Sequence, residues 1–324
     1  MVANTVSFNG LLGRLSLARV TCVGDVMLDR YVIGEVKRIS PEAPVPVLAV
    51  KEEKSVAGGA ANVALNIRAL GAKVETIGWF GSDGRGDELV KILGQEKIEV
   101  DASYRFSSAP TICKSRVTAS NQQICRVDRE ASQQCYSPDL ETLSNDIIEK
   151  VSRSDGVIIS DYGKGFISNE LLRLVSKHAK FVSIDPKPSR LLEYTSHDLL
   201  TPNRLEALEL AGYSRQSSDP FPWQKVASKI FEKFAPKMLA VTLGSEGMLL
   251  AEDGKVNGII PTSAREVFDV SGAGDTVIAA LTLGLITKLD FQQAAEFANI
   301  AAGVVVGKVG TATASPAEIL QFFE

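Results

Sequence analysis

Residues 269–275 read Asp-Val-Ser-Gly-Ala-Gly-Asp and bring two glycines and two carboxylates together in a short space. They follow a β-prone run at residues 266–268 and precede an apolar run at residues 276–286, which predicts a strand, a tight glycine turn and the start of a helix. The first amides of a helix lack partners and lie at the positive end of its dipole, so such a turn binds anions, phosphate above all. Asp275, in the first helical turn, could contact a substrate hydroxyl beside that phosphate, or it could only complement the helix dipole.

Further polar residues and glycines stand where predicted strands end or predicted helices begin. In an open α/β sheet, ligands bind at the carboxyl ends of the strands. Asn203 and Glu206 also fit a helix capping box, so structure alone could explain that pair. The full set at such positions is Asp25, Asp29, Gly58, Gly59, Lys187, Asn203, Glu206, Gly244 and the turn at residues 272–275.

The elements that would position these residues alternate between strand and helix. This alternation predicts an α/β fold with a mostly parallel sheet and helices on both of its faces. Strands are predicted at residues 19–24, 73–80, 157–159, 181–184, 199–200 and 238–243, with a hairpin at 248–260. Helices are predicted at residues 60–70, 87–97, 138–151, 169–180, 276–286 and 291–307. No repeat or flexible linker divides the chain, so we expect a single domain over residues 1–324.

Two segments depart from this alternation and predict a small β lid inserted into the domain. Residues 31–50 contain three prolines and strand-like alternating pieces, and residues 111–128 read as a β-hairpin. The lid is locally basic in an acidic protein, although a solvated strand face is the simpler interpretation of any single charge. Its basic residues include Lys37, Arg38, Lys114, Arg116 and Arg126.

The composition excludes several classes of function. The 324 residues are 45% hydrophobic and 23% charged with a formal net charge of −4, which gives no argument for nucleic-acid binding. No apolar stretch approaches the ~20 residues of a membrane helix. Residues 1–18 lack a signal-peptide pattern, so we expect a cytoplasmic protein that does not insert into membranes. The four cysteines have no CxxC spacing, which disfavours a zinc site, and His178 and His197 are expected at solvated positions.

Three motifs together resemble the PfkB/ribokinase family of carbohydrate kinases. Residues 269–275 are similar to the signature D-T-x-G-A-G-D, with Val270 in place of the usual Thr. Residues 58–64 resemble the amino-terminal signature of the family, and residues 203–206 resemble its N-x-x-E motif. The resemblance covers roughly residues 20–320 and implies a ribokinase-like three-layer α/β/α domain that uses ATP with Mg²⁺ to phosphorylate a sugar hydroxyl. The sequence has neither a GxxxxGK[ST] phosphate loop nor the protein-kinase motifs.

The resemblance implies roles for individual residues by their place in these motifs. Asp275 would be the catalytic base that deprotonates the anomeric hydroxyl. The anion hole for the moving phosphoryl group would be Ser271, Gly272, Ala273 and Gly274. The nucleotide site would include Lys187, Asn203, Arg204, Leu205, Glu206, Thr242, Gly244, Gly247 and Asn299, with Glu206 meeting Mg²⁺ through water. The sugar hydroxyls would be held by Asp25, Asp29, Gly58, Gly59 and Asn62. Candidates for binding a phosphate already on the substrate are the lid residues Lys37, Arg38 and Arg116, because a dianion needs cationic donors.

Longer segments resemble one branch of this family, the kinases of D-glycero-β-D-manno-heptose 7-phosphate. Among these segments are GDVMLDRY, RISPEAPVPV, SDYGKG and AAGVVVGKVGT. The resemblance implies that the product is heptose 1,7-bisphosphate, early in ADP-heptose supply for lipopolysaccharide core. The sequence ends at Glu324 without the HxGH motif of the cytidylyltransferase often fused to such kinases, which implies a stand-alone kinase. Lids of the family often pair, so a homodimer through the lid is expected. Some members of the family also need a monovalent cation near the anion hole, and the sequence leaves this requirement open here.

Three other functions compete with this interpretation. A kinase of another sugar or of a nucleoside, such as a ribokinase or fructokinase, would share the fold, although a basic lid favours a phosphorylated substrate. An NAD-dependent oxidoreductase would need GxGxxG after the first strand, where residues 24–26 are Gly-Asp-Val. A non-catalytic sugar-phosphate sensor is disfavoured by the intact Asp275.

Overall fold

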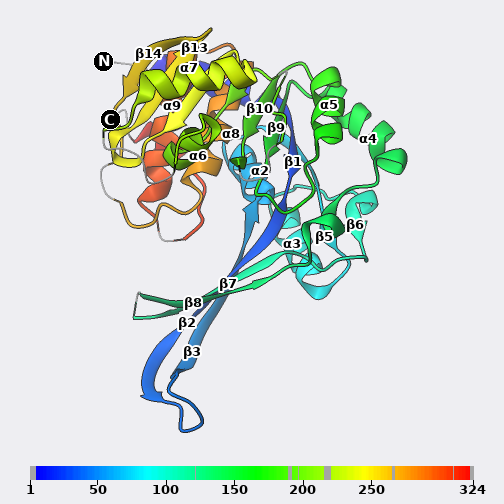
Figure 1. Ribbon diagram of the computed structural model, residues 1–324, viewed down its shortest axis with the longest axis vertical. Coiled ribbons are helices and arrows are strands. Elements are labelled where there is room, and N and C mark those ends of the chain that lie inside the picture. Colours follow the sequence, from blue (N-terminus) through cyan, green and yellow to red (C-terminus); the bar gives the residue numbers. More distant parts are fainter. Residues whose placement is uncertain are drawn as a thin grey trace.

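The central β-sheet is built from the buried apolar runs of the sequence. The structure, a computed structural model, describes residues 5–120, 122–188, 192–195, 197–214, 220–264, 267–308 and 310–321. Within these residues the sheet has eight strands in the order β14-β13-β12-β11-β10-β9-β1-β4 (Figure 1). Their bounds are β1 (Arg19–Gly24), β4 (Lys73–Gly78), β9 (Gly156–Ser160), β10 (Val182–Asp185), β11 (Leu199–Leu200), β12 (Met238–Thr242), β13 (Met248–Glu252) and β14 (Lys255–Ile260). The strands from β4 to β12 pair in parallel, and the hairpin β13–β14 adds an antiparallel edge.

Helices cover both faces of this sheet, as neighbouring strand residues show. Thr21 of β1 hydrogen-bonds to Ser154 at the end of α4, and its register through β9 matches Val182 of β10. The next residue, Ser183, therefore points to the opposite face, where it meets Thr282 of α8 at 2.7 Å. The helices are α1 (Thr5–Leu17), α2 (Ala60–Ala69), α3 (Gly84–Gln95), α4 (Leu140–Arg153), α5 (Asn169–His178), α6 (Arg204–Leu210), α7 (Trp223–Phe234), α8 (Ala273–Ile286), α9 (Phe291–Val306) and α10 (Pro316–Leu320). Among the described residues, none of these helices is both long enough and apolar enough to cross a bilayer.

A second sheet projects away from the domain and forms the lid (Figure 1). Its strands, in the order β3-β2-β7-β8, are β3 (Pro46–Gly59), β2 (Val26–Ile39), β7 (Cys113–Ala119) and β8 (Gln122–Arg129). A single residue, Asp25, separates β2 from β1, and β3 runs directly into α2. The start of β2 and the end of β3 therefore both lie at the ligand edge of the central sheet. The predicted small inserted β-sheet is confirmed, although its first two strands extend beyond residues 31–50. Asn121, in the predicted hairpin turn, lies outside the described residues.

Two local predictions are wrong. Residues 267 and 268 form no strand. Their side chains are 63% and 65% exposed, and the Phe268 amide donates a hydrogen bond to the carbonyl of Val306 on α9. Glu266, the first residue of that β-prone run, lies outside the described residues. His197 is 3% exposed rather than solvated, because it lies two residues before β11, a strand in the middle of the sheet. The helices α1 and α7 were not predicted, and small β5 (Phe80–Gly81) and β6 (Arg105–Phe106) pair beside α3.

Candidate active site

The start of α8 is an open, glycine-built turn. Gly272 is the N-cap residue with a φ of 80°, a left-handed conformation that glycine adopts readily. The carboxylate of Asp269 holds the preceding loop, because it accepts hydrogen bonds from the amides of Ser271 (2.9 Å) and Gly310 (3.1 Å). A Cβ built on Gly274 would meet no atom of the described residues within 4 Å. The first turn of this helix therefore has room for an anion beside the amides of the helix start.

Asp275 lies in that first turn and is held by two hydrogen-bond donors. Its side chain is 4% exposed. The Nδ2 of Asn62, on α2, donates to Oδ2 at 2.6 Å, and the hydroxyl of Tyr162, in the loop after β9, donates to Oδ1 at 2.7 Å. Three separate elements thus fix the orientation of one carboxylate. Asn62 was predicted to hold a sugar hydroxyl, but in this structure its amide group contacts the predicted base.

The surroundings of Asp275 move its pKa towards neutrality. Burial raises the pKa to about 6, while the hydrogen bonds from Asn62 and Tyr162 oppose this rise because they stabilise the charged form. The nearby Asp29 raises the pKa further and Lys114 lowers it. A carboxylate with such a pKa is mostly ionised at pH 7 and still able to hold a proton, which is what a general base requires.

Tyr162 was not assigned a role from the sequence, although its motif was part of the family resemblance. It lies in the loop after β9, and Asp25 shapes this loop. One oxygen of Asp25 accepts hydrogen bonds from the amides of Tyr162 and Lys164, both at 2.9 Å, and the other accepts one from Phe166 at 3.1 Å. The carboxylate predicted to bind sugar hydroxyls is thus engaged in positioning the loop that carries Tyr162.

A cavity of about 260 Å³ opens beside Asp275 on the predicted nucleotide side. Lys187 lies at its wall and forms an ion pair with Oε1 of Glu206 at 3.1 Å. Asn203 caps α6 through its side chain, and Oε2 of Glu206 accepts a hydrogen bond from the Asn203 amide, which completes a capping box. The pair therefore caps α6 and lines the cavity at the same time. The lining consists of Asp161, Tyr162, Asp185, Pro186, Lys187, Thr201, Asn203, Glu206, Thr242, Gly272, Gly274 and Asp275.

The acidic lining of this cavity suits a divalent cation that arrives with phosphates. Burial raises the pKa of Asp185 well above its ordinary value, and the charges of Glu206 and Asp275 raise it further. A cation would offset this crowding of negative charge. The described residues contain no group of three or more His, Cys, Asp or Glu side chains arranged to hold a metal ion alone. Phosphate oxygens and water would therefore complete the coordination of Mg²⁺, which ordinarily keeps several waters. Glu206, with both oxygens already engaged, fits a contact through water.

Several of the residues predicted to bind the nucleotide do not line this cavity. Gly247 has a φ of 98°, and a Cβ there would come within 2.0 Å of the carbonyl oxygen of Ile260, so glycine is required for the chain to turn. Asn299, on α9, donates to the carbonyl of Pro261 at 2.7 Å and to Ser263 at 3.0 Å, and so holds the loop after β14. The remaining predicted residues near this side are Arg204, paired with Glu246, the partly exposed Leu205, and Gly244 at the start of a short 3₁₀ turn.

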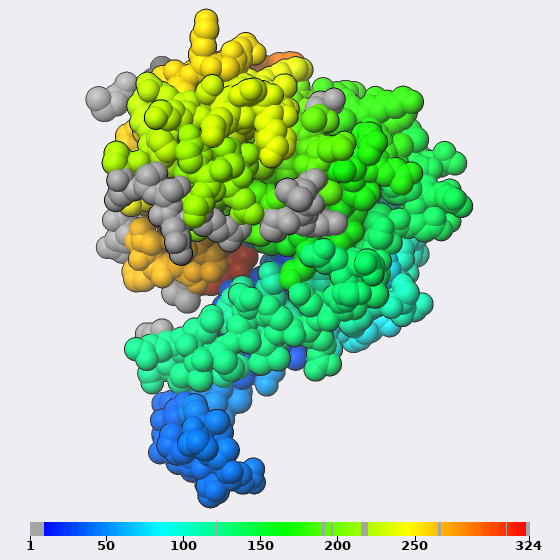
Figure 2. All heavy atoms as spheres, viewed as in Figure 1, coloured from blue at the N-terminus to red at the C-terminus, as the bar shows by residue number. Residues whose placement is uncertain are grey.

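The predicted sugar side lies where the lid joins the domain, and Figure 2 shows a recess between the two. Asp29, on β2, is 6% exposed and accepts a hydrogen bond from Arg116 of β7 at 2.6 Å. Gly58 must lack a side chain, because a Cβ would come within 2.3 Å of Oδ2 of Asp29. Gly59 has a φ of 59° where β3 turns into α2. The structure thus brings Asp29, Gly58 and Arg116 together, and Gly59 follows Gly58 at the start of α2.

Lys37 and Arg38 do not join this group within the chain. Both lie in the outer half of β2, which forms the projecting arm of the lid in Figure 1. Lys37 lies eight residues beyond Asp29, or about 26 Å along an extended strand. Its side chain is 78% exposed and pairs with Glu35. The prediction that these two residues contact the substrate is therefore not supported at the chain's own site, because β2 is longer than the sequence suggested and carries them away from Asp29.

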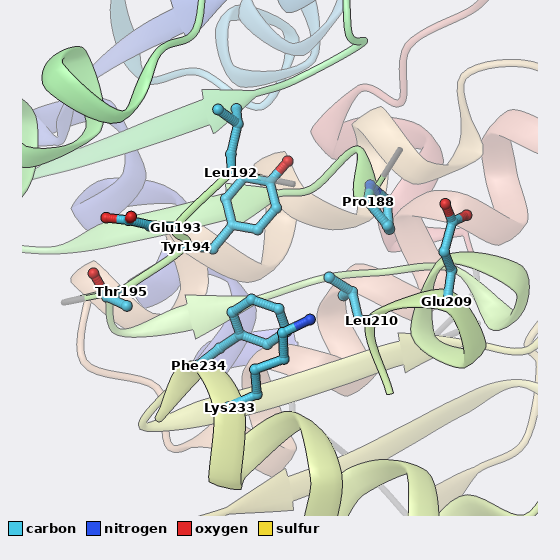
Figure 3. Close-up of a pocket in the computed structure, with 9 residues that line it drawn as sticks. All are labelled: Pro188, Leu192, Glu193, Tyr194, Thr195, Glu209, Leu210, Lys233 and Phe234. Atoms are coloured by element: carbon cyan, nitrogen blue, oxygen red, sulfur yellow. The ribbon is translucent and has the colours of Figure 1, made fainter. Parts of the chain in front are cut away.

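A larger cavity, of about 490 Å³, lies elsewhere and is shown in Figure 3. Its walls are mostly apolar and include none of the residues predicted to do chemistry. One lining residue, Pro188, directly follows Lys187 in the chain. The lining residues are Pro188, Leu192, Glu193, Tyr194, Thr195, Glu209, Leu210, Lys233 and Phe234. Tyr194 connects it to the site, because its hydroxyl donates to Asp161 at 2.7 Å and accepts from the Lys187 amide at 2.9 Å. The smaller, polar cavity remains the candidate active site, because phosphates need donors and cations.

Comparisons with known proteins show which proteins this chain is similar to. A family profile described as pfkB family carbohydrate kinase matches residues 17–318. The bifunctional protein HldE of Sulfurimonas denitrificans is 39% identical over 308 residues, which cover 94% of this chain and 64% of that protein. The bifunctional protein HldE of Helicobacter pylori is 42% identical over 307 residues, which cover 94% of this chain and 66% of that protein. The chain thus spans a little less than two thirds of the length of these relatives.

Solved structures share the fold at lower sequence identity. Arabidopsis thaliana ribokinase complexed with ribose and ATP matches with a TM-score of 0.76 and 24% identity over 95% of this chain and 99% of that one. The tetrameric inhibited form of Escherichia coli phosphofructokinase-2 matches with a TM-score of 0.76 and 21% identity over 95% of this chain and 98% of that one. These likenesses confirm the predicted ribokinase-like α/β fold.

Proposed function

Because this chain belongs to the pfkB family of carbohydrate kinases, we propose that it phosphorylates the anomeric hydroxyl of D-glycero-β-D-manno-heptose 7-phosphate and makes the 1,7-bisphosphate. The predicted class of activity, an ATP-dependent kinase of a sugar hydroxyl, is confirmed by the family match and the structural neighbours. The finer proposal rests on the roughly 40% identity to HldE proteins over 94% of the chain. The product would enter ADP-heptose supply, and we place the reaction in the cytoplasm.

One observation carries the catalytic part of the proposal, the buried Asp275 carboxylate held by Asn62 and Tyr162 at the start of α8. Asp275 accepts the proton of the anomeric hydroxyl as its oxygen bonds to the γ-phosphorus of ATP. The bond from that phosphorus to the bridging oxygen breaks, and ADP leaves with the electron pair. The amides of the turn around Gly272 and Gly274 stabilise the charge on the moving phosphoryl group.

The nucleotide side of the cavity supplies charge neutralisation. Lys187 reaches the phosphates once it leaves or shares its ion pair with Glu206. Mg²⁺ bound with ATP neutralises phosphate charge. Glu206 would meet it through water, and Asn203 would contact the phosphates from the start of α6. A monovalent cation near the anion hole remains a proposal that no residue in the cavity singles out.

We also infer that two copies pair through the lid. Several β-branched side chains of the lid are exposed, and within the described residues its outer strands β3 and β8 each have one unpaired edge. Pairing would cover both features. The exposed apolar residues are Ile33, Val36, Ile39, Val45, Val50, Ile124 and Val127. Sedimentation of wild type and Ile39→Asp tests this; a monomeric wild type would contradict it.

A kinase of another sugar or nucleoside on the same fold is the competing proposal. The test is ATP consumption with heptose 7-phosphate, heptose, fructose 6-phosphate, ribose and a nucleoside, with Asp275→Asn as the inactive control. We expect the highest kcat/KM for heptose 7-phosphate. A higher value for any other acceptor would overturn the proposed substrate and leave the family intact. Activity unchanged by Asp275→Asn would overturn the mechanism.

A further inference from the structure

The lid presents a cluster of cations to the active site. Lys114 and Arg116 lie two residues apart on β7, so their side chains point to the same face of the lid sheet. On the neighbouring β8, Asp128 and Arg126 are their register partners and share that face. This face turns towards the domain, because the Lys114 ammonium lies 5.5 Å from the centre of the Tyr162 ring. The cluster is therefore adjacent to the residue that orients the base.

Lys164, in the loop after β9, adds a fourth cation whose charge acts on Lys114. Three of these four cations have carboxylate partners. The pairs are Arg116–Asp29 at 2.6 Å, Arg126–Asp128 at 2.8 Å and Lys164–Glu130 at 2.5 Å. Lys114 makes no ion pair within the part of the chain that the structure describes. Positive charge thus exceeds negative charge by one among these side chains, and the excess lies on Lys114, beside Tyr162.

The surroundings of Lys114 disfavour its positive charge. Burial lowers its pKa, and the charges of Lys164, Arg126 and Arg116 lower it further, although Asp29 opposes them. Lys114 in turn lowers the pKa of Asp275, so its charge acts across the space in which the sugar would lie. A bound anion would relieve the repulsion among these cations and repay part of the cost of burying the Lys114 ammonium.

We propose that Lys114, together with Arg116, binds the phosphate monoester that the sugar already carries, and that this contact makes the enzyme select phosphorylated sugars. Arg116 can contribute because its guanidinium has five N–H donors, and the hydrogen bond to Asp29 uses one of them. The inference rests on the proposed function and deepens it. It replaces Lys37 and Arg38, which lie too far along β2, with a residue that faces the site.

The test compares phosphorylated and unphosphorylated heptose as acceptors at saturating Mg–ATP. The wild type, Lys114→Met, Lys114→Arg and Lys51→Met are assayed for kcat/KM with both sugars. Lys51 is the matched control, because it is a lid lysine on β3 that is 60% exposed and pairs with Glu35 away from the site. Lys114→Met should reduce the preference for the phosphorylated sugar by about 10- to 100-fold, the value of one hydrogen bond between charged groups. Lys114→Arg should keep most of the preference, and Lys51→Met should keep all of it.

Each outcome separates this inference from the function on which it rests. If the wild type prefers heptose 7-phosphate and Lys114→Met retains that preference, Lys114 does not bind the phosphate and the proposed function stands. An equal loss with both sugars would also refute the inference, because Lys114 would then act on the base or on folding. Urea unfolding of Lys114→Met distinguishes those two causes. A wild type that treats both sugars alike refutes the proposed substrate, and the inference with it.

Discussion

Replacing Asp275 by asparagine should greatly reduce activity and, at the same time, stabilise the ligand-free protein above neutral pH. The buried carboxylate has a pKa of about 6, against 3.8 for the unperturbed group. The folded state therefore binds more protons than the unfolded state between about pH 4 and pH 6, so its stability falls as pH rises through that window. Above pH 6 the full cost of the buried charge is present.

The size of this effect follows from the two pKa values. A difference of about two pKa units means that the buried charge of Asp275 destabilises the folded state by about 3 kcal/mol at pH 8. By the linkage relation, about half of this destabilisation is left at pH 5. An asparagine at position 275 avoids this cost and can keep both partners. Its oxygen can accept from Asn62, and its NH₂ group can donate to the Tyr162 oxygen. Loss of the general base should lower kcat by about 10²- to 10⁴-fold.

The difference in unfolding free energy between wild type and Asp275→Asn can be measured by urea unfolding. The measurements are made at pH 8, pH 6.5 and pH 5, without nucleotide or sugar. The advantage of the variant should shrink as pH falls. Glu296→Gln is the control, because Glu296 is an exposed carboxylate on α9 and its loss should have no such pH dependence. A variant that is less stable than wild type at pH 8, or whose advantage does not change with pH, would refute the account of Asp275 as a buried, poised base.

Three further substitutions probe the site. Tyr162→Phe removes a hydrogen bond to ionised Asp275, so the acid limb of the kcat/KM profile should move above pH 6; an unmoved limb would contradict the pairing. Glu206→Gln can keep the capping box but loses the charge, so stability in urea should hold while the Mg²⁺ requirement in the kinase assay rises about tenfold. Gly274→Ala places a methyl group in open space beside the anion hole, so folding should be unaffected while kcat/KM falls about 100-fold; normal turnover would place the phosphoryl group elsewhere.

Much of the scaffold could be predicted from local patterns. The strand before Asp25 was predicted at residues 19–24 and spans Arg19–Gly24, because buried parallel strands are short, continuous apolar runs with clear ends. The capping box at Asn203 and the helix start at Gly272 were also predictable, since caps and glycine turns depend on residues close in sequence. The exposed residues 267 and 268 show the limit of such patterns, because β-prone residues form a strand only when a partner strand is beside them.

The partners of Asp275 could not be predicted in the same way. Asn62 is 213 positions from Asp275 and Tyr162 is 113 positions away, so only the folded sheet brings them to one carboxylate. The sequence did contain a signal for the second, because the polar run of residues 160–165 follows a buried strand, as ligand loops do. That polar run predicts a ligand-binding loop, but it does not predict that Tyr162 contacts Asp275. The hydrogen bonds of Asp25 to the loop amides decide which side chain turns inwards.

Lys114 shows why charge patterns alone do not locate an anion site. Strand alternation is enough to place Lys114 and Arg116 on one face of the lid, so the sequence indicates that a basic face exists. It does not indicate which of the cations on that face is neutralised. The carboxylates that pair with the others come from β2, β8 and the chain just beyond β8, and the strand register decides which cation each one meets. A shift of one residue would turn every side chain of a strand to the other face. The excess charge is therefore a property of the register, and so is the preference for phosphorylated sugars that we infer from it.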